Sequence, residues 1–213
     1  MRKHAGLESS LKILMAVMIT LAGAIQVANG QSSKTLYDLA KEKGKDGKYM
    51  HRFDATGGIS YSNVEEVAKR SDAIIIGRPV RVSSYLSPDG ASITTRCWVK
   101  PQEIVKGRVN RMGRIIVSVP GGAHVYRDKT IVSVRSFYYL PPQKGHIYAF
   151  FLRKDANDPK LWNVVGGSQG QFELILPSDA VQPGENNKMN PLRNKYKNMT
   201  ARQFLKEVRR VAR

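Results

Sequence analysis

Between residues 73 and 176, short apolar segments alternate with turn-forming residues, and none of the connections has a helical pattern. Glycine and proline mark several of the turns, as at 87–90 and 120–122. Successive strands without helices between them predict a mainly β fold, an antiparallel barrel or sandwich. A closed barrel is favoured because it leaves no strand edge exposed. Seven segments have the composition and periodicity of β-strands: 73–82, 91–105, 113–119, 130–134, 146–152, 161–165 and 171–176.

Short helices are predicted on both sides of these strands. Ser33 is suited to cap a first helix that Gly44 ends. Residues 63–70 carry the apolar face of a second helix, with Ser62 or Asn63 as its cap. Residues 45–61, between these helices, have the composition of a loop. Thr200 is a suitable cap for a final helix, in which the apolar residues form one stripe and the basic residues lie opposite it.

The first thirty residues have the features of a secretory signal peptide. Basic residues come first, an apolar stretch follows at 13–28, and small residues close it. The stretch is shorter than the ~20 apolar residues that a membrane-spanning helix needs. Cleavage is expected after Gly30 or, as the alternative, after Ala24. We therefore expect export to the periplasm or to the outside of the cell.

These features predict five parts in the chain. The segment that follows the last strand is polar and interrupted by proline, so we expect it to be a mobile linker. The parts are a signal peptide (1–30), an N-terminal extension with short helices (31–71), a β-barrel domain (72–176), the linker (177–199) and a C-terminal amphipathic basic helix (200–213).

The charge is strongly positive. Thirty-five Lys and Arg against seventeen Asp and Glu give a net charge of +18. Such a surface attracts polyanions by a long-range, salt-sensitive force, and it says nothing specific about the fold. The charge of the last helix is also compatible with a helix that only packs its apolar stripe on the barrel. The candidate anion-binding residues are Arg78, Arg81, Arg96, Lys100, Arg202, Lys206, Arg209 and Arg210.

A hydrolase motif at 166–170 is better explained as a turn. The segment Gly-Gly-Ser-Gln-Gly fits the Gly-x-Ser-x-Gly pattern, which works as a nucleophile elbow only between a strand and a helix. Here residues 171–176 have the pattern of another strand, and no histidine follows Ser168. We therefore interpret the segment as a glycine-rich hairpin or bulge, and we expect no enzymatic activity.

The remaining reactive side chains indicate neither a metal site nor a cofactor site. Cys97 lies on the same alternating face as apolar neighbours, which favours a small core residue. The histidines of the mature chain, His51, His124 and His146, lack close metal-ligand spacing and have no accompanying cysteine or carboxylate cluster. We expect no bound cofactor.

Four landmarks occur in the order found in a widespread group of exported bacterial domains of unassigned function. They are Ser-Asp-Ala-Ile-Ile-Ile-Gly at 71–77, Glu-Ile-Val-Lys-Gly at 103–107, Val-Pro-Gly-Gly at 119–122, and the strand at 145–152 with its Phe-Phe-Leu end. Residues 72–176 therefore resemble that group. The strand rhythm is also similar to that of netrin-like and tissue-inhibitor-of-metalloproteinase domains.

This resemblance implies a barrel with the oligonucleotide/oligosaccharide-binding (OB) topology. Inhibitors of the metalloproteinase type use an N-terminal cysteine and several disulfides, whereas this chain has one cysteine. The resemblance therefore does not imply protease inhibition.

Three functions remain open at this point. The first is an exported noncatalytic binding or structural module of the bacterial envelope, whose partner is an anionic polymer, an anionic lipid surface or another envelope protein. The second is a nucleic-acid-binding barrel, with aromatic residues as stacking platforms. The third, ranked last, is a hydrolase with a scattered active site. The candidate stacking residues are Tyr85, Trp98, Tyr126, Tyr138 and Tyr139.

Overall fold

The computed structural model describes residues 34–53, 60–110, 112–136, 139–184 and 186–213. Thr35–Arg213 form one compact unit, to which the following description applies. The predicted signal peptide, 1–30, lies outside the described residues.

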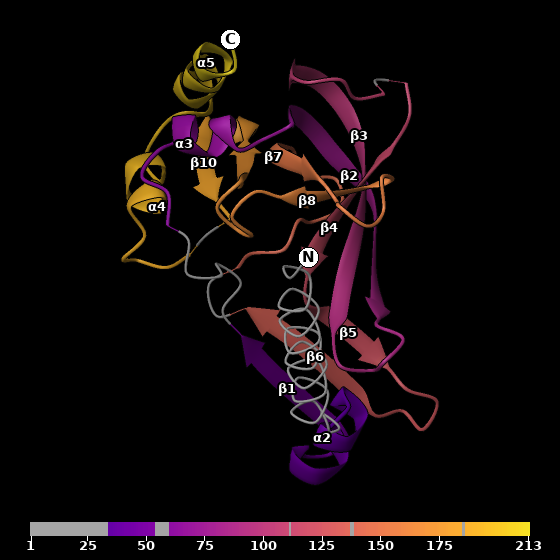
Figure 1. The fold of residues 1–213 in the computed structure, drawn as a ribbon. Helices are drawn as coiled ribbons and strands as arrows, with labels where there is room; N and C mark the ends of the chain where they lie inside the picture. The colour runs from indigo at the N-terminus through magenta and orange to yellow at the C-terminus, as the bar shows by residue number, and fades with distance from the viewer. Residues whose placement is uncertain (1–33, 54–59, 111, 137–138, 185) are drawn as a thin grey trace, which may run out of the picture. The chain divides into compact units, whose positions relative to one another are not determined.

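The helices and strands are shown in Figure 1. They are α2 (Leu36–Lys43), β1 (Lys48–Phe53), α3 (Val64–Lys69), β2 (Ala73–Leu86), β3 (Ile93–Lys106), β4 (Ile115–Pro120), β5 (Gly122–Val125), β6 (Ile131–Ser136), β7 (Tyr148–Lys154), β8 (Leu161–Val164), β9 (Gln171–Ile175), the 3-10 turn η1 (Leu176–Ser178), β10 (Ala180–Pro183), α4 (Pro191–Tyr196) and α5 (Ala201–Val211). The mainly β fold with short helices and a C-terminal helix is confirmed.

The described strands form two sheets. The smaller has the order β1-β6-β5, and the larger has the order β10-β9-β7-β2-β3-β4-β8. Strand β7 also pairs with β8, so that β7, β2, β3, β4 and β8 form a closed ring. Among the described strands, β1–β6 and β4–β8 are parallel pairs, and the other pairs are antiparallel as predicted.

All seven predicted strands are present, and three more were not predicted. Strand β1 lies in the segment 45–61, which we expected to be a loop, and it pairs with β6. Strands β5 and β10 are only four residues long, so their alternation is too short to distinguish them from turns.

The prediction of a linker at 177–199 needs correction, because this segment contains β10 and α4. Tyr196 is completely buried, and its hydroxyl accepts a hydrogen bond from the Val64 backbone N–H at 3.1 Å. The same hydroxyl donates to Glu207 Oε1 at 2.8 Å. Two buried side chains, Tyr196 and Leu192, therefore attach a segment of polar composition to the core.

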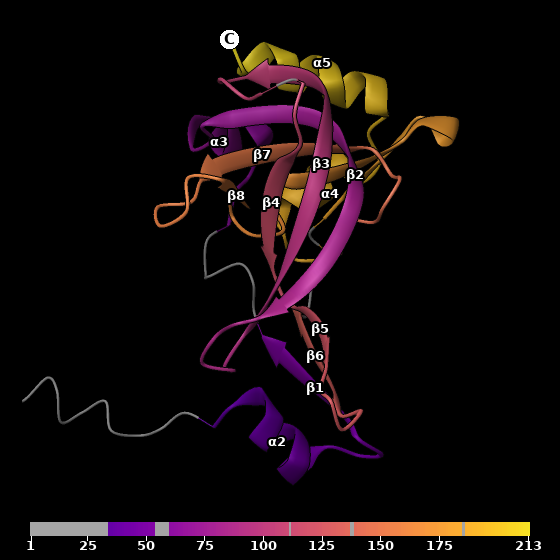
Figure 2. The same cartoon turned by 90° about the vertical axis from the view of Figure 1, so that its right-hand side faces the viewer.

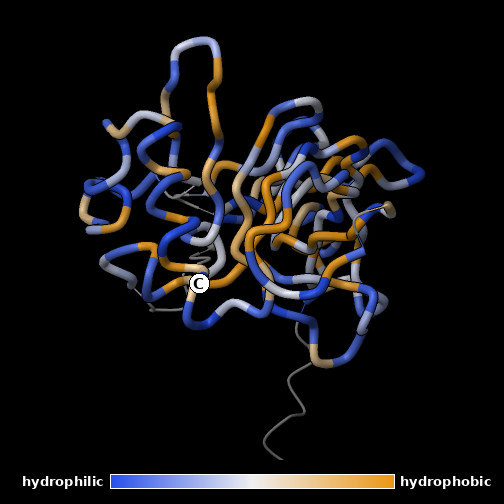
Figure 3. Tube along the Cα trace, turned by 90° about the horizontal axis from the view of Figure 1, so that it is seen from above, coloured by the Kyte–Doolittle hydropathy of each residue, from blue (hydrophilic) through white to orange (hydrophobic). Residues whose placement is uncertain are grey.

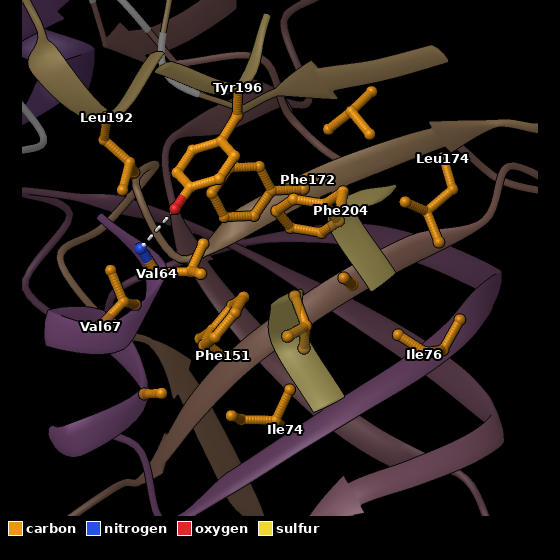
Figure 4. Close-up of a cluster of buried hydrophobic side chains, with 14 of the residues drawn as sticks. Val64, Val67, Ile74, Ile76, Phe151, Phe172, Leu174, Leu192, Tyr196 and Phe204 are labelled. Atoms are coloured by element: carbon orange, nitrogen blue, oxygen red, sulfur yellow. Dashed lines mark hydrogen bonds between the residues drawn. The ribbon is translucent and has the colours of Figure 1, made fainter. Parts of the chain in front are cut away.

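The core lies on both sides of the large sheet. Residues inside the ring, among them Ile75, Cys97 and Phe150, form one cluster. The opposite side of β2, β7 and β9 packs against the helices α3, α4 and α5, as Figure 4 shows for Phe172 and Phe204. Figure 3 shows that hydrophobic stretches gather among the strands, whereas the outer turns are mostly hydrophilic.

The predicted helix caps are largely confirmed. Asn63 caps α3 and Thr200 caps α5, each accepting a hydrogen bond from the backbone N–H of the third helical residue. Helix α2 is capped by Thr35 rather than Ser33. In α5, Phe204 and Val208 are completely buried, so the predicted apolar stripe packs on the sheet.

A candidate anion-binding face on the β2–β3 ribbon

Strands β2 and β3 form a long antiparallel ribbon, which Figure 2 shows as a twisted pair. Each strand has 14 residues, and their pairing runs from Ile74 opposite Lys106 to Leu86 opposite Ile93. Side chains of a strand point alternately to its two faces. Cys97 and Val99 accordingly point into the ring, and the residues between them and next to them point outward.

A β-bulge places the basic residues of β2 on one face. Arg78 and Arg81 are three positions apart, so a regular strand would place them on opposite faces. The register shifts between Pro79 and Arg81, which leaves Val80 as the extra residue. Arg78 therefore lies opposite Lys100 and Arg81 opposite Trp98, two β3 residues that share the outer face.

The outer face of the ribbon consequently carries a row of cross-strand pairs. After Arg78 with Lys100 and Arg81 with Trp98 come Ser83 with Arg96 and Tyr85 with Thr94. We call this surface the cationic face. It is made of Arg78, Arg81, Arg96, Lys100, Tyr85 and Trp98.

The two aromatic rings of the cationic face are in contact with guanidinium groups. The Cζ atom of Arg81 lies 4.5 Å from the centroid of the Trp98 ring, and that of Arg96 lies 4.9 Å from the Tyr85 centroid. The centroids of the Tyr85 and Trp98 rings are 6.4 Å apart. A cation–π contact at an exposed site contributes about 0.5–1 kcal/mol. These contacts hold the two arginines close to the ribbon without neutralising them.

The charges of the cationic face are not compensated by ion pairs. Within the part of the chain that the structure describes, none of its four basic residues forms a salt bridge. The ion pairs described there are Lys41–Asp128, Lys69–Glu65, His146–Glu173, Lys195–Glu207 and Arg209–Glu103. The face therefore offers four cations to a partner, next to two aromatic rings.

The candidate residues of α5 have a different environment. Arg209 donates two hydrogen bonds of 2.8 Å, from Nε and Nη2, to the two carboxylate oxygens of Glu103 on β3. This hydrogen bonding raises the pKa of Arg209. Arg209 thus attaches α5 to the ribbon near the Lys100 end, whereas Arg202, Lys206 and Arg210 are exposed.

Two other aromatic candidates, Tyr126 and Tyr139, have partners elsewhere than on the cationic face. Tyr126 packs against the rings of Tyr37 and His124, at centroid distances of 4.8 Å and 4.6 Å. Tyr139 donates a hydrogen bond from its hydroxyl to Gln171 Oε1 at 2.9 Å. Tyr138 lies outside the described residues.

The candidate nucleophiles are enclosed. Cys97 is completely buried, and burial raises the pKa of its thiol to about 12, so the thiol is protonated at neutral pH. Ser168 is 1% exposed and lies in the turn between β8 and β9, where Gly166 and Gly167 have positive φ angles of 64° and 63°. The strand β9 follows that turn, so it is not a strand-to-helix elbow.

The described residues contain no group of three or more His, Cys, Asp or Glu side chains placed to hold a metal ion. No helix among them has both the length and the apolar content needed to span a membrane.

No protein-family model matches the sequence, and no curated protein matches it at a significant level.

Proposed function

We propose that this protein is an exported noncatalytic binding module of the bacterial envelope, which holds an anionic partner on the cationic face. The observation that carries the proposal is the arrangement of Arg81 and Arg96. Both guanidinium groups lie against aromatic rings, and neither forms an ion pair within the described part of the chain. Arginine forks form bidentate hydrogen bonds with carboxylate, sulfate or phosphate groups, which strengthen the Coulomb attraction.

The export part of the proposal rests on the sequence of residues 1–30. Its envelope part rests on the resemblance of residues 72–176 to exported bacterial domains. The closed five-stranded ring supports the proposal of an OB-like barrel, because OB barrels have five strands. Barrels of that type bind oligonucleotides and oligosaccharides on a strand face, as we propose for the cationic face.

The test is a binding titration of the purified protein with heparin and with polyphosphate, at several salt concentrations. The double variant Arg81→Gln/Arg96→Gln should bind both polymers about tenfold to a hundredfold more weakly than the unchanged protein, because two charge-assisted contacts are lost. For the double variant, a plot of the logarithm of the binding constant against the logarithm of the salt concentration should also be less steep than for the unchanged protein.

A matched control removes the same charge elsewhere. Lys160 lies in the turn before β8 and Lys188 precedes α4, and both are exposed. The double variant Lys160→Gln/Lys188→Gln has the same net charge as the ribbon variant. If both double variants lose the same affinity, the attraction is a bulk property of the surface and the proposed face is wrong.

A single-stranded nucleic acid is the second candidate partner, and the two rings of the cationic face favour it. Bases stack on aromatic side chains and on arginine planes, at about 1–3 kcal/mol per base. The variant Trp98→Leu should therefore weaken binding of a dT oligonucleotide about tenfold, and binding of polyphosphate, which cannot stack, by much less. Equal losses with both probes would exclude stacking as part of recognition.

A further inference from the structure

A cavity of about 310 Å³ opens beside Arg78, at one end of the cationic face. Besides Arg78, it is lined by His146, which precedes β7, and by Glu173 on β9. Leu174 and Leu176 add apolar surface. A cation of the proposed binding face thus shares one cavity with an imidazole, a carboxylate and apolar walls.

The imidazole of His146 is held in one orientation. Its Nδ1 atom lies 2.6 Å from Glu173 Oε1, and the Tyr148 hydroxyl donates a 3.4 Å hydrogen bond to Glu173 Oε2. Burial raises the pKa of Tyr148, so its hydroxyl remains a donor. The Nδ1 contact leaves Nε2 as the ring nitrogen available to a ligand. When the ring is an imidazolium, Nδ1–H donates to Glu173 and Nε2–H can donate to an anion. Because two partners engage the Glu173 carboxylate, it repels an incoming anion less than a bare carboxylate would.

Arg78 supplies the charge in this cavity. It is exposed, lies opposite Lys100, and forms no salt bridge within the described residues. Its guanidinium group carries five N–H donors in a planar fork that fits the two oxygens of a carboxylate or a phosphate.

The cavity can hold only one unit of a polymer. Its volume lies at the lower limit of small-molecule sites. Residues 173–177 of β9 and η1 line one side of it. Two residues before Arg78, Ile76 packs in the cluster that includes α3 and α5, so a chain that follows the β2–β3 ribbon meets protein here rather than open surface.

We propose that this cavity takes the acidic group at the end of a polymer bound along the cationic face. The inference rests on the proposed function, since it assigns the polymer to that face. Arg78 binds the terminal carboxylate or phosphate, and the imidazolium form of His146 donates a second hydrogen bond to it from Nε2. The module therefore binds polymer ends in preference to internal segments, and it binds them in one direction.

Matched probes with and without an acidic end test this proposal. For phosphate, the probes are dT octamers with a 5′-phosphate, a 3′-phosphate or two hydroxyl ends. For carboxylate, they are hexaglutamate peptides with a free or an amidated C-terminus. Binding at fixed low salt should be about tenfold tighter for a probe with an acidic end than for its blocked counterpart, because Arg78 and His146 then both contact the terminal group. The series that has this preference identifies the terminal group.

Two variants separate the cavity from the face. His146→Leu should reduce the end preference to about threefold or less, because Arg78 alone then binds the terminal group. It should leave the affinity for the blocked probes unchanged, because His146 lies outside the cationic face. Arg81→Gln should weaken the binding of all probes. It should keep the ratio between the affinities for the probes with free ends and those with blocked ends. Circular dichroism of each variant verifies that the fold is retained.

The outcomes distinguish the two proposals. If the probes bind without any preference for an acidic end, or if His146→Leu keeps the full preference, the cavity has no such role and the cationic face stands. If no probe binds the unchanged protein, the proposed function itself fails, and the role of the cavity fails with it.

Discussion

The cationic face and the helix α5 are both basic, but they present their charges differently. On the ribbon, Arg81 and Arg96 lie against aromatic rings and form no ion pair within the described residues. On α5, Arg209 is paired with Glu103 through two hydrogen bonds, and Phe204 is buried under the helix. The ribbon thus displays its cations, whereas the helix has a buried stripe and one neutralised cation that attach it to the sheet.

This difference shows that net charge alone does not identify a binding surface. Both regions contribute four candidate residues, and the charge count cannot rank them. What ranks them is the environment of each guanidinium or ammonium group: its ion-pair partner, its contact with a ring, and the apolar residues beside it. This ranking supports the proposal that the ribbon binds the partner and that α5 has a structural role.

The largest expected effect comes from removing the main anchor of α5. Phe204 is completely buried and packs 4.6 Å, centroid to centroid, from the ring of Phe172. Phe204→Ala should lower the free energy of unfolding by about 3–5 kcal/mol, measured by urea denaturation. The affinity of the folded fraction for heparin should stay within about twofold, because the cationic face is unchanged. A loss of binding that exceeds the loss of folded protein would show that α5 shapes the binding site.

A smaller effect is expected from the exposed cations of the helix. Arg202→Gln/Lys206→Gln removes two positive charges, as the ribbon variant does. It should weaken heparin binding less than about threefold, since screened charges outside the contact contribute little. The measurement is the same salt titration. A loss as large as that of Arg81→Gln/Arg96→Gln would remove the distinction between the two surfaces.

Much of this fold could be predicted from local sequence signals. The strands 73–82 and 91–105 are predicted from their long apolar and alternating runs. The cap Thr200 and the pair Ser62 or Asn63, of which Asn63 is the cap, are predicted because they precede apolar stripes. Strand β1 was not predicted, because its partner β6 is about 80 residues away and parallel pairing leaves no hairpin signal.

The site was predicted only as a set of residues. Arg78, Arg81, Arg96 and Lys100 were named from their charge, but alternation alone places Arg78 and Arg81 on opposite faces. The bulge at Val80 brings them to one face, and it is visible only in the pairing register of β2 with β3. Proline at position 79, which lacks an N–H donor, was the sequence signal that could have indicated it. The bidentate pair of Arg209 with Glu103 joins residues 106 positions apart and had no such signal.

The smallest expected effect concerns that pair, and a double-mutant cycle measures it. Arg209 and Glu103 are 48% and 38% exposed, so solvent screens their attraction despite the good geometry. Arg209→Gln, Glu103→Gln and the combined variant should give a coupling energy of about 0.5–1 kcal/mol in urea denaturation, decreasing with added salt. Heparin binding should change by less than about twofold for Arg209→Gln, since its charge is already neutralised. If Glu103→Gln strengthens binding about tenfold while Arg209→Gln abolishes that gain, the pair holds Arg209 back from the ligand, and α5 belongs to the binding surface after all.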